Sequence, residues 1–253
     1  MMGKNDDKNW RAWRERFASR KDRALPPLET DYDYRQLPRS VARSLAVFQL
    51  GESGGGTVVE QARRAKLKGI DSDYADAVEM FVAEEHRHAN ILAMAVRLTG
   101  GDLLRDNWTD RLFVYGRRLM GLRLKLLVLL AAEVVGLVYY RAIAERLPPG
   151  VLRRWLEELV EDERMHLDFH CAFLRSQVKS RRARLVFLCT WRLLMVAAGV
   201  VVLVDHRQTL RDLHLDRGRL WQSWVEYRQA AEGKVLGEDI VATSPATRPV
   251  PAR

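Results

Sequence analysis

The chain has 253 residues, of which 47% are hydrophobic, and this size allows one sizeable core or one domain with appended segments. Its two cysteines, Cys171 and Cys189, provide neither a disulfide framework nor a CxxC metal pair, so we expect a reducing, cytoplasmic setting. The net charge of +9 is spread along the chain without any nucleic-acid-binding motif, which argues against a nucleic-acid partner.

Residues 1–38 are predicted to form a basic segment followed by a linker. Three aromatic residues stand at helical spacing among many Arg and Lys: Trp10, Trp13 and Phe17. The segment lacks the apolar core of a secretory signal. A solvated, frayed terminus is the default expectation, although basic amphipathic helices that contain Trp also bind anionic membrane surfaces. Three prolines mark residues 24–38 as the linker.

Four long helices are predicted within residues 39–178, because helical periodicity dominates and strand signals are nearly absent. Their expected ranges are 39–68, 71–99, 109–147 and 151–178. Asp71 or Ser72 can cap the second helix, and glycines 100–101 can end it. Pro148 can end the third. Long helices with short connections favour an all-α, up-and-down bundle or a variant with one longer crossover.

Two further helices are predicted in an accessory region, residues 179–232. They cover about 185–205 and 217–232. The first is very apolar, but Arg192 interrupts it and leaves an unbroken part that is too short to span a bilayer. This helix is expected to cap the bundle, to form a homodimer interface or to contact a membrane peripherally. The tail 233–253 is expected to be disordered.

Two copies of an acidic-residue–Glu–x–x–His pattern are the most informative motif. Residues 84–88 read Glu-Glu-His-Arg-His, and residues 162–166 read Asp-Glu-Arg-Met-His. Helix residues three apart share a face, so each copy can direct one carboxylate and one imidazole to the same point. Glu52 and Glu133 lie inside apolar stretches of two other helices, where a buried carboxylate is expensive unless it is paired or bound to metal.

Together these residues form a candidate metal-binding set of four carboxylates and two imidazoles. The set is Glu52, Glu85, His88, Glu133, Glu163 and His166. The order Glu, then Glu-x-x-His, occurs twice, over 33 residues (85 − 52) and 30 residues (163 − 133), which indicates an internal duplication. Hard oxygen ligands with two nitrogens suit iron or manganese, and six protein ligands are enough for two ions.

On these residues, the segment 40–178 resembles the ferritin-like di-iron carboxylate proteins, such as bacterioferritin and rubrerythrin. The glycine-rich stretch 48–54 around Glu52 is similar to hydroxylases with a Gly-Glu-x-Gly first helix, such as the demethoxyubiquinone hydroxylases. The resemblance implies a ferritin-like four-helix bundle, here with two additional C-terminal helices. It also implies two iron ions as cofactor, with manganese or a mixed Mn/Fe pair as alternatives.

The function that this resemblance implies is that of a non-haem di-iron oxidoreductase. Such an enzyme would use O2 or peroxide to hydroxylate or oxidise a small organic substrate. No flavin or nicotinamide fingerprint occurs in the chain, so an external electron donor is expected. Two alternatives stay open: a ferroxidase or peroxide-scavenging protein, and a structural or membrane-associated helical protein whose metal only stabilises the fold.

Several neighbours of the candidate ligands have two interpretations each. Four polar residues flank them: Glu84, Asp162, Asn90 and Asp168. These are either surface residues or acceptors that orient a ligating histidine by taking its other N–H. His170 is either a third nitrogen ligand, as in arylamine N-oxygenases of this superfamily, or a core histidine. The glycines beside Glu52 either permit close helix packing or leave room for O2 or a substrate.

Overall fold

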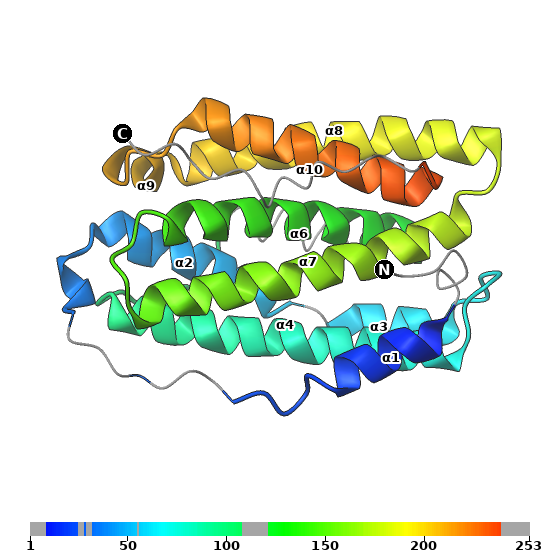
Figure 1. Cartoon of the computed structure of the whole chain (residues 1–253), viewed down its shortest axis with the longest axis horizontal. Coiled ribbons are helices and arrows are strands. Elements are labelled where there is room, and N and C mark those ends of the chain that lie inside the picture. Colours follow the sequence, from blue (N-terminus) through cyan, green and yellow to red (C-terminus); the bar gives the residue numbers. More distant parts are fainter. Residues whose placement is uncertain (1–8, 25–27, 29–31, 55, 108–120, 239–253) are drawn as a thin grey trace.

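The computed structural model describes residues 9–24, 28, 32–54, 56–107 and 121–238 (Figure 1). Within these residues the chain is helical and contains no β-strand, which confirms the predicted all-α class. The predicted start of the third helix at Thr109 and most of the predicted disordered tail lie outside the described residues.

Two long helices agree closely with their predicted ranges: α4 (Ser72–Leu98) and α7 (Val151–Gln177). The prediction of one continuous helix over 109–147 was wrong, because α6 (Leu122–Ala144) begins only after Gly121, whose backbone is extended. The Asp71 carboxylate accepts a hydrogen bond from the Tyr74 amide at 3.0 Å and so caps α4. Gly100 follows the end of α4 with a φ of +73°, a conformation that favours glycine. α6 is apolar around most of its circumference, and it is accordingly buried along almost its whole length.

The first long helix is interrupted, so the prediction of one continuous helix over 39–68 was wrong. The chain forms α2 (Arg39–Glu52) and α3 (Gly56–Arg64), with a turn at Ser53 and Gly54 between them. Glycine inside a helix costs about 1 kcal/mol relative to alanine, and a run of glycines therefore makes continuation of the helix unfavourable. The break places Glu52 at the end of α2 instead of in the middle of a helix.

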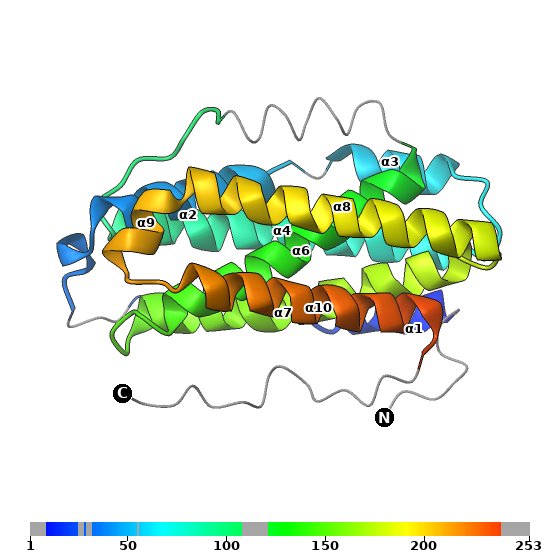
Figure 2. The same ribbon diagram turned by 90° about the horizontal axis from the view of Figure 1, so that it is seen from above.

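The helices lie side by side, with α2 and α3 against α4, and α6 against α7 (Figures 1 and 2). α3 also contacts α6, and α4 contacts α7. These contacts bring α4 and α7, the two helices with the duplicated motif, against each other in the interior. The remaining element of this part, α1 (Trp10–Ala18), packs along α4.

The C-terminal helices form a layer over α6 and α7 (Figure 1). They are α8 (Arg181–Asp205), the short α9 (Arg207–Asp212) and α10 (Arg217–Leu236). Both predicted accessory helices are therefore present. α10 continues four residues into the predicted disordered tail, because Val235 is buried and Gly237 ends the helix in a left-handed conformation.

The N-terminal helix is packed, so the expectation of a solvated, frayed terminus was wrong for residues 10–18. Trp10, Trp13 and Phe17 are each at most 3% exposed. The Trp10 indole donates a hydrogen bond to the Gly69 carbonyl at 2.7 Å, and all three rings contact Phe169 of α7. The aromatic face that suggested membrane binding is therefore used inside the protein.

Replacing Trp13 by alanine is expected to destabilise the fold by about 3 kcal/mol, because the change removes a buried indole that packs on Phe169. The measurement is urea unfolding followed by circular dichroism. Arg11→Ala is the control on the same helix, since its side chain is 71% exposed and its ion pair with Asp73 spans 3.7 Å. That variant should stay within about 0.5 kcal/mol of the parent. Equal stability of both variants would contradict the observed docking of α1.

Candidate metal centre

The two Glu-x-x-His motifs face each other across the contact between α4 and α7. Glu85 and His88 come from α4, and Glu163 and His166 come from α7. One ligand atom from each residue lies within 4.8 Å of the others, and all four side chains are buried. The prediction that the two motifs direct their Glu and His side chains to one point is therefore confirmed. The resulting group could hold a metal ion.

Each imidazole directs its Nδ1 atom towards the carboxylates of both helices. His166 Nδ1 lies 3.0 Å from Glu85 Oε1 and 3.2 Å from Glu163 Oε2. His88 Nδ1 lies 3.4 Å from Glu163 Oε1 and 3.7 Å from Glu85 Oε1. The two halves of the cluster are therefore interleaved, and neither helix forms a separate site.

Glu133 of α6 belongs to the same cluster. Its two carboxylate oxygens lie 3.6 Å from His166 Nδ1 and 3.4 Å from His170 Nε2. Burial, followed by repulsion from Glu163 and Glu85, raises the pKa of Glu133 well above its ordinary value. The predicted carboxylate of the third helix thus reaches the cluster that the two motifs form.

Glu52 approaches from the end of α2 and is half-buried. Burial and the nearby charges of Glu85 and Glu163 raise its pKa well above the ordinary value. The Tyr140 hydroxyl donates a hydrogen bond to Glu52 Oε1 at 2.7 Å. Tyr140 lies seven residues, or about two helical turns, after Glu133, which places it on the same side of α6. This spacing is the sequence signal that places Tyr140 near the cluster.

His170 lies within the cluster, one turn after His166 on α7. It is fully buried, with Nε2 facing Glu133. Burial and the neighbouring His166 lower the pKa of His170 to about 3, so its imidazole is neutral, which is the form that binds metals. The structure therefore places His170 Nε2 beside the six predicted ligand residues, as an additional candidate nitrogen ligand.

Several buried polar atoms at the cluster lack a hydrogen-bond partner among the described residues. They are Glu85 Oε1, His88 Nδ1 and both ring nitrogens of His170. Buried polar atoms are nearly always satisfied, because leaving one unpaired costs about 1–3 kcal/mol. A cation between the carboxylates would satisfy such atoms and would also offset the repulsion that raises the pKa of Glu133 and Glu52. The donor set therefore fits a bound metal.

The residues that precede the ligand glutamates hold the histidines of the opposite helix. Glu84 Oε2 lies 2.9 Å from His166 Nε2, and Asp162 Oδ2 lies 3.2 Å from His88 Nε2. When each acid accepts the Nε2 proton, Nδ1 keeps its lone pair directed at the cluster. Each acid thus contacts the ligand histidine of the other helix. These contacts support the interpretation that Glu84 and Asp162 orient the histidines.

Asn90 and Asp168 do not share this role. Asn90 is exposed, and Asp168 is partly exposed and pairs with Lys234 of α10. Both follow a ligand histidine by two residues, and such a step turns a side chain to the other side of a helix. The orienting interpretation of these two residues was therefore wrong.

Arginines from the N-terminal segment reach the two orienting acids, a contact that the sequence analysis missed. Arg20 bridges both helices, through Glu84 Oε1 at 3.2 Å from its Nε and through Asp162. Arg23 also binds Asp162, and Arg87 of α4 lies 3.6 Å from the same carboxylate. Burial opposes ionisation of Glu84, but its hydrogen bond to His166 and the charge of Arg20 keep its pKa below the ordinary value. His166 and Arg20 together therefore favour the charged form of Glu84 in the interior, and the arginines place positive charge beside Asp162.

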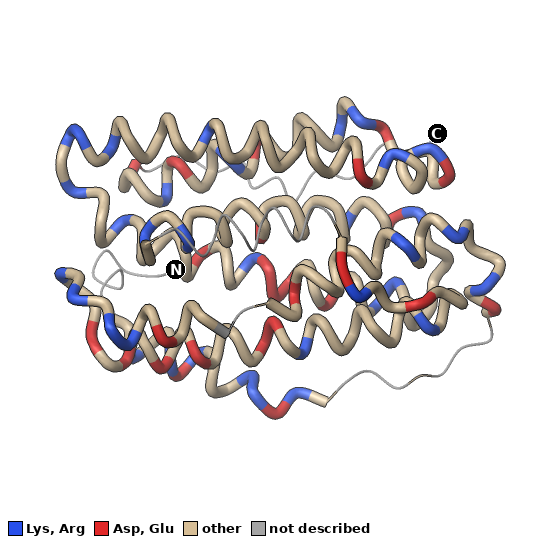
Figure 3. The backbone as a smooth tube through the Cα atoms, turned by 180° about the vertical axis from the view of Figure 1, so that it is seen from behind, with Lys and Arg blue, Asp and Glu red and all other residues tan. Residues whose placement is uncertain are grey.

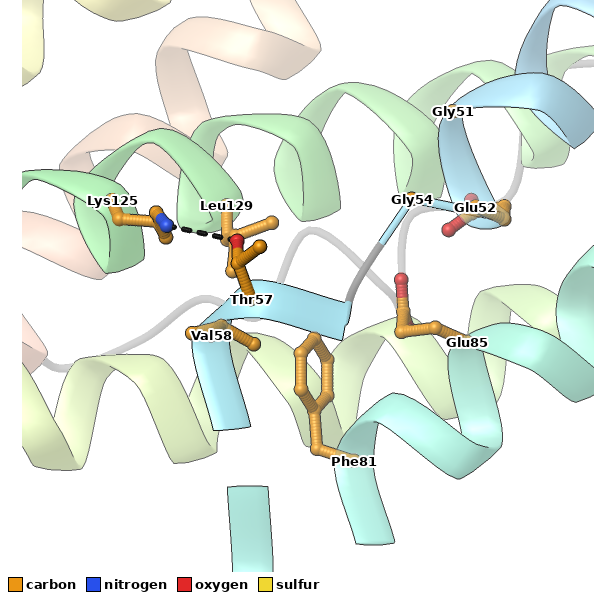
Figure 4. Close-up of a pocket in the computed structure, with 9 residues that line it drawn as sticks. All are labelled: Gly51, Glu52, Gly54, Thr57, Val58, Phe81, Glu85, Lys125 and Leu129. Carbon is orange, nitrogen blue, oxygen red and sulfur yellow. Dashed lines mark hydrogen bonds between the residues drawn. The ribbon is translucent and has the colours of Figure 1, made fainter. Parts of the chain in front are cut away.

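A pocket leads to the cluster at the break between α2 and α3 (Figure 4). It is lined by Gly51, Glu52, Gly54, Thr57, Val58, Phe81, Glu85, Lys125 and Leu129. The carboxylates of Glu52 and Glu85 lie at one end, and Lys125 donates a hydrogen bond to the Thr57 hydroxyl at 3.1 Å near the other (Figure 4). A Cβ atom added at Gly51 would meet no atom within 4 Å, so this glycine leaves open space and is not required for close packing.

No protein-family model, curated protein or solved structure matches the chain. The resemblance to ferritin-like proteins therefore depends on the residues of the cluster and their arrangement.

Asp162→Asn is expected to weaken Mn²⁺ binding by about 10- to 100-fold, because an amide in place of the carboxylate removes the charge that holds His88. Isothermal titration calorimetry on the metal-free protein measures the effect. Asp168→Asn makes the same chemical change six residues later on α7, where the side chain binds only Lys234 among the described partners. It should leave the affinity unchanged. Equal affinities of the two variants would refute the orienting role of Asp162.

Proposed function

We propose that the cluster holds two iron ions and that the protein is a non-haem di-iron oxidoreductase of the ferritin-like type. The observation that carries this proposal is the convergence of four carboxylates and two motif histidines, from four separate segments, on one buried point beside a pocket. In this proposal, α2 with α3, α4, α6 and α7 correspond to the four helices of a ferritin-like bundle.

The ligands in this proposal are the six residues that the sequence singled out, joined by His170. The set is Glu52, Glu85, His88, Glu133, Glu163, His166 and His170. Bound iron would supply the electron transfer to O2 that none of these side chains performs. The carboxylates would neutralise the metal charge, and the two acids Glu84 and Asp162 would keep each motif histidine in the tautomer that binds through Nδ1.

The pocket supports access of a small reactant such as O2 to the metals, since its volume of about 20 Å³ has room for about one small molecule. Its walls include the apolar side chains of Val58, Phe81 and Leu129, and its inner end is formed by Glu52 and Glu85. A metal site that only stabilised the fold would need no such opening, and the helix break beside Glu52 would then be a cost without a benefit. Because the chain contains no flavin or nicotinamide fingerprint, the reducing equivalents would come from a separate protein.

Protein purified anaerobically and loaded with Fe²⁺ is expected to contain about two irons per chain. Glu85→Ala and His166→Ala should each lose bound iron, because each change removes a ligand from the centre of the cluster. His86→Ala is the matched control, since this residue directly follows Glu85 on α4 but its side chain is exposed. Metal analysis of the four proteins gives the result. Full occupancy in both ligand variants would refute the site.

The reaction with O2 separates the three candidate functions. An oxygenase should show an optical change on O2 addition to the di-iron protein, and Leu129→Trp, which narrows the pocket, should keep both irons but slow oxidation of added apolar compounds. Iron oxidation that continues over many equivalents of Fe²⁺, without any dependence on an organic substrate, would indicate a ferroxidase. A di-iron protein that does not react with O2 or peroxide would indicate a structural metal.

A further inference from the structure

The outer face of α8 exposes an unusual concentration of apolar side chains. Nine large hydrophobic residues are exposed in the described chain, and six of them belong to this helix. They are Leu185, Val186, Leu193, Val196, Val200 and Val204, which are 47–70% exposed. We call these six residues the α8 stripe. Scattered exposed hydrophobic residues are normal on a protein surface, but a continuous row on one helix indicates a surface that binds something.

The stripe is a single straight surface on a helix that is fixed in place. Its residues recur at helical spacing over 19 positions (204 − 185), about 28 Å along the axis. The opposite side of α8 is packed through Phe187, Trp191 and Met195. At Gly199, an added Cβ would come within 3.2 Å of the Trp224 ring, so the glycine allows α10 to pack closely. The stripe therefore faces outward because the inner side of the helix is already occupied.

Basic residues lie at both ends of this stripe (Figure 3). Arg181, Arg182 and Arg184 are exposed at the start of α8, and Arg207 and Arg211 are exposed just after its end. Of the acidic residues near the second end, Asp212 is half-buried and accepts a hydrogen bond from Ser40, and Asp216 caps α10. The single acidic residue of α8 is Asp205, whose side chain is only 6% exposed. Arg192, in the middle of the helix, is directed back to Glu232 of α10 at 3.1 Å. An apolar row with a cationic cluster at each end complements a surface that is apolar inside and anionic outside.

A second copy of the chain fits this stripe poorly. A two-fold symmetric contact between antiparallel α8 helices would place the arginines at the start of one helix beside Arg207 and Arg211 of the other. A parallel contact would place each cationic cluster of one chain beside the same cluster of the second chain. α8 offers no exposed carboxylate to neutralise either arrangement, so the charges disfavour self-association through this face.

By length and composition alone, α8 could cross a membrane, as could α6, so the expectation that Arg192 leaves too short an apolar part was wrong. α6 is largely buried inside the protein, whereas α8 is largely exposed. A spanning position would require α8 to leave its contacts with α6 and α10 and to expose Trp191, which is now fully buried. Contact along the helix side keeps those contacts and buries only the stripe.

We propose that α8 docks the protein onto an anionic membrane surface, with the α8 stripe in the acyl boundary and the flanking arginines at the lipid phosphates. This proposal does not depend on the metal centre. It also assigns membrane contact to a different segment from the N-terminal helix, whose aromatic residues are buried.

Sedimentation with vesicles tests the proposal on the full chain. The protein should pellet with phosphatidylcholine vesicles that contain phosphatidylglycerol and should stay in solution with phosphatidylcholine alone. The double variant Leu193→Asp with Val200→Asp should not bind the vesicles. Because both side chains are exposed, the two changes should leave the fold intact. The control Gln222→Asp with Gln229→Asp adds the same charge on exposed positions of α10 and should keep the binding. Equal loss in both double variants would mean general charge attraction and would overturn docking by the stripe.

Cys189 provides a direct probe of the same face. It is exposed and lies four residues from both Leu185 and Leu193, whereas the other cysteine, Cys171, is buried. A polarity-sensitive fluorophore on Cys189 should shift to shorter wavelength when anionic vesicles are added. No shift together with no sedimentation would overturn the proposal. A concentration-dependent dimer that the Leu193→Asp and Val200→Asp changes dissociate would identify a second copy as the occupant and would also overturn it.

Discussion

Carboxylate crowding in a low-dielectric interior is the constraint on which the rest of this structure depends. Glu52, Glu85, Glu133 and Glu163 interact electrostatically within one buried cluster, and repulsion among them adds to the cost of burial. Such a group persists only when cations or protons balance it. In this protein, charges of alternating sign surround the carboxylates. His88 and His166 lie next to the carboxylates, Glu84 and Asp162 contact these histidines, and Arg20 and Arg23 contact the two acids.

The centre of this arrangement was predictable from sequence because it depends on local helix geometry. Two motifs with three-residue spacing, each on an amphipathic helix, determine where Glu85, His88, Glu163 and His166 point once α4 and α7 are in contact. The bounds of α4 and α7 followed from equally local signals, such as the Asp71 cap. Periodicity likewise indicated the two C-terminal helices.

The outer parts were not predictable in the same way, because they depend on contacts between distant residues. A basic N-terminal segment has the same sequence signature whether its arginines are solvated or bound to buried acids, and only the tertiary structure places Arg20 between Glu84 and Asp162. Glycines near Glu52 indicated weakness in the first helix but not the position of the break. The orienting interpretation failed for Asn90 and Asp168, because helix geometry directs their side chains away from the cluster.

The bridge that Arg20 makes has a consequence for the order in which the chain folds. Its partner Asp162 is 142 residues away, so the contact cannot form until α7 has been synthesised and has packed against α4. The first helix to emerge during translation therefore cannot complete its contacts until α7 has joined α4. Until then, the Arg20 bridge between Glu84 and Asp162 is absent, and the aromatic residues of α1 lack their contacts with Phe169. Docking of the N-terminal segment thus depends on the same contact between α4 and α7 that assembles the cluster.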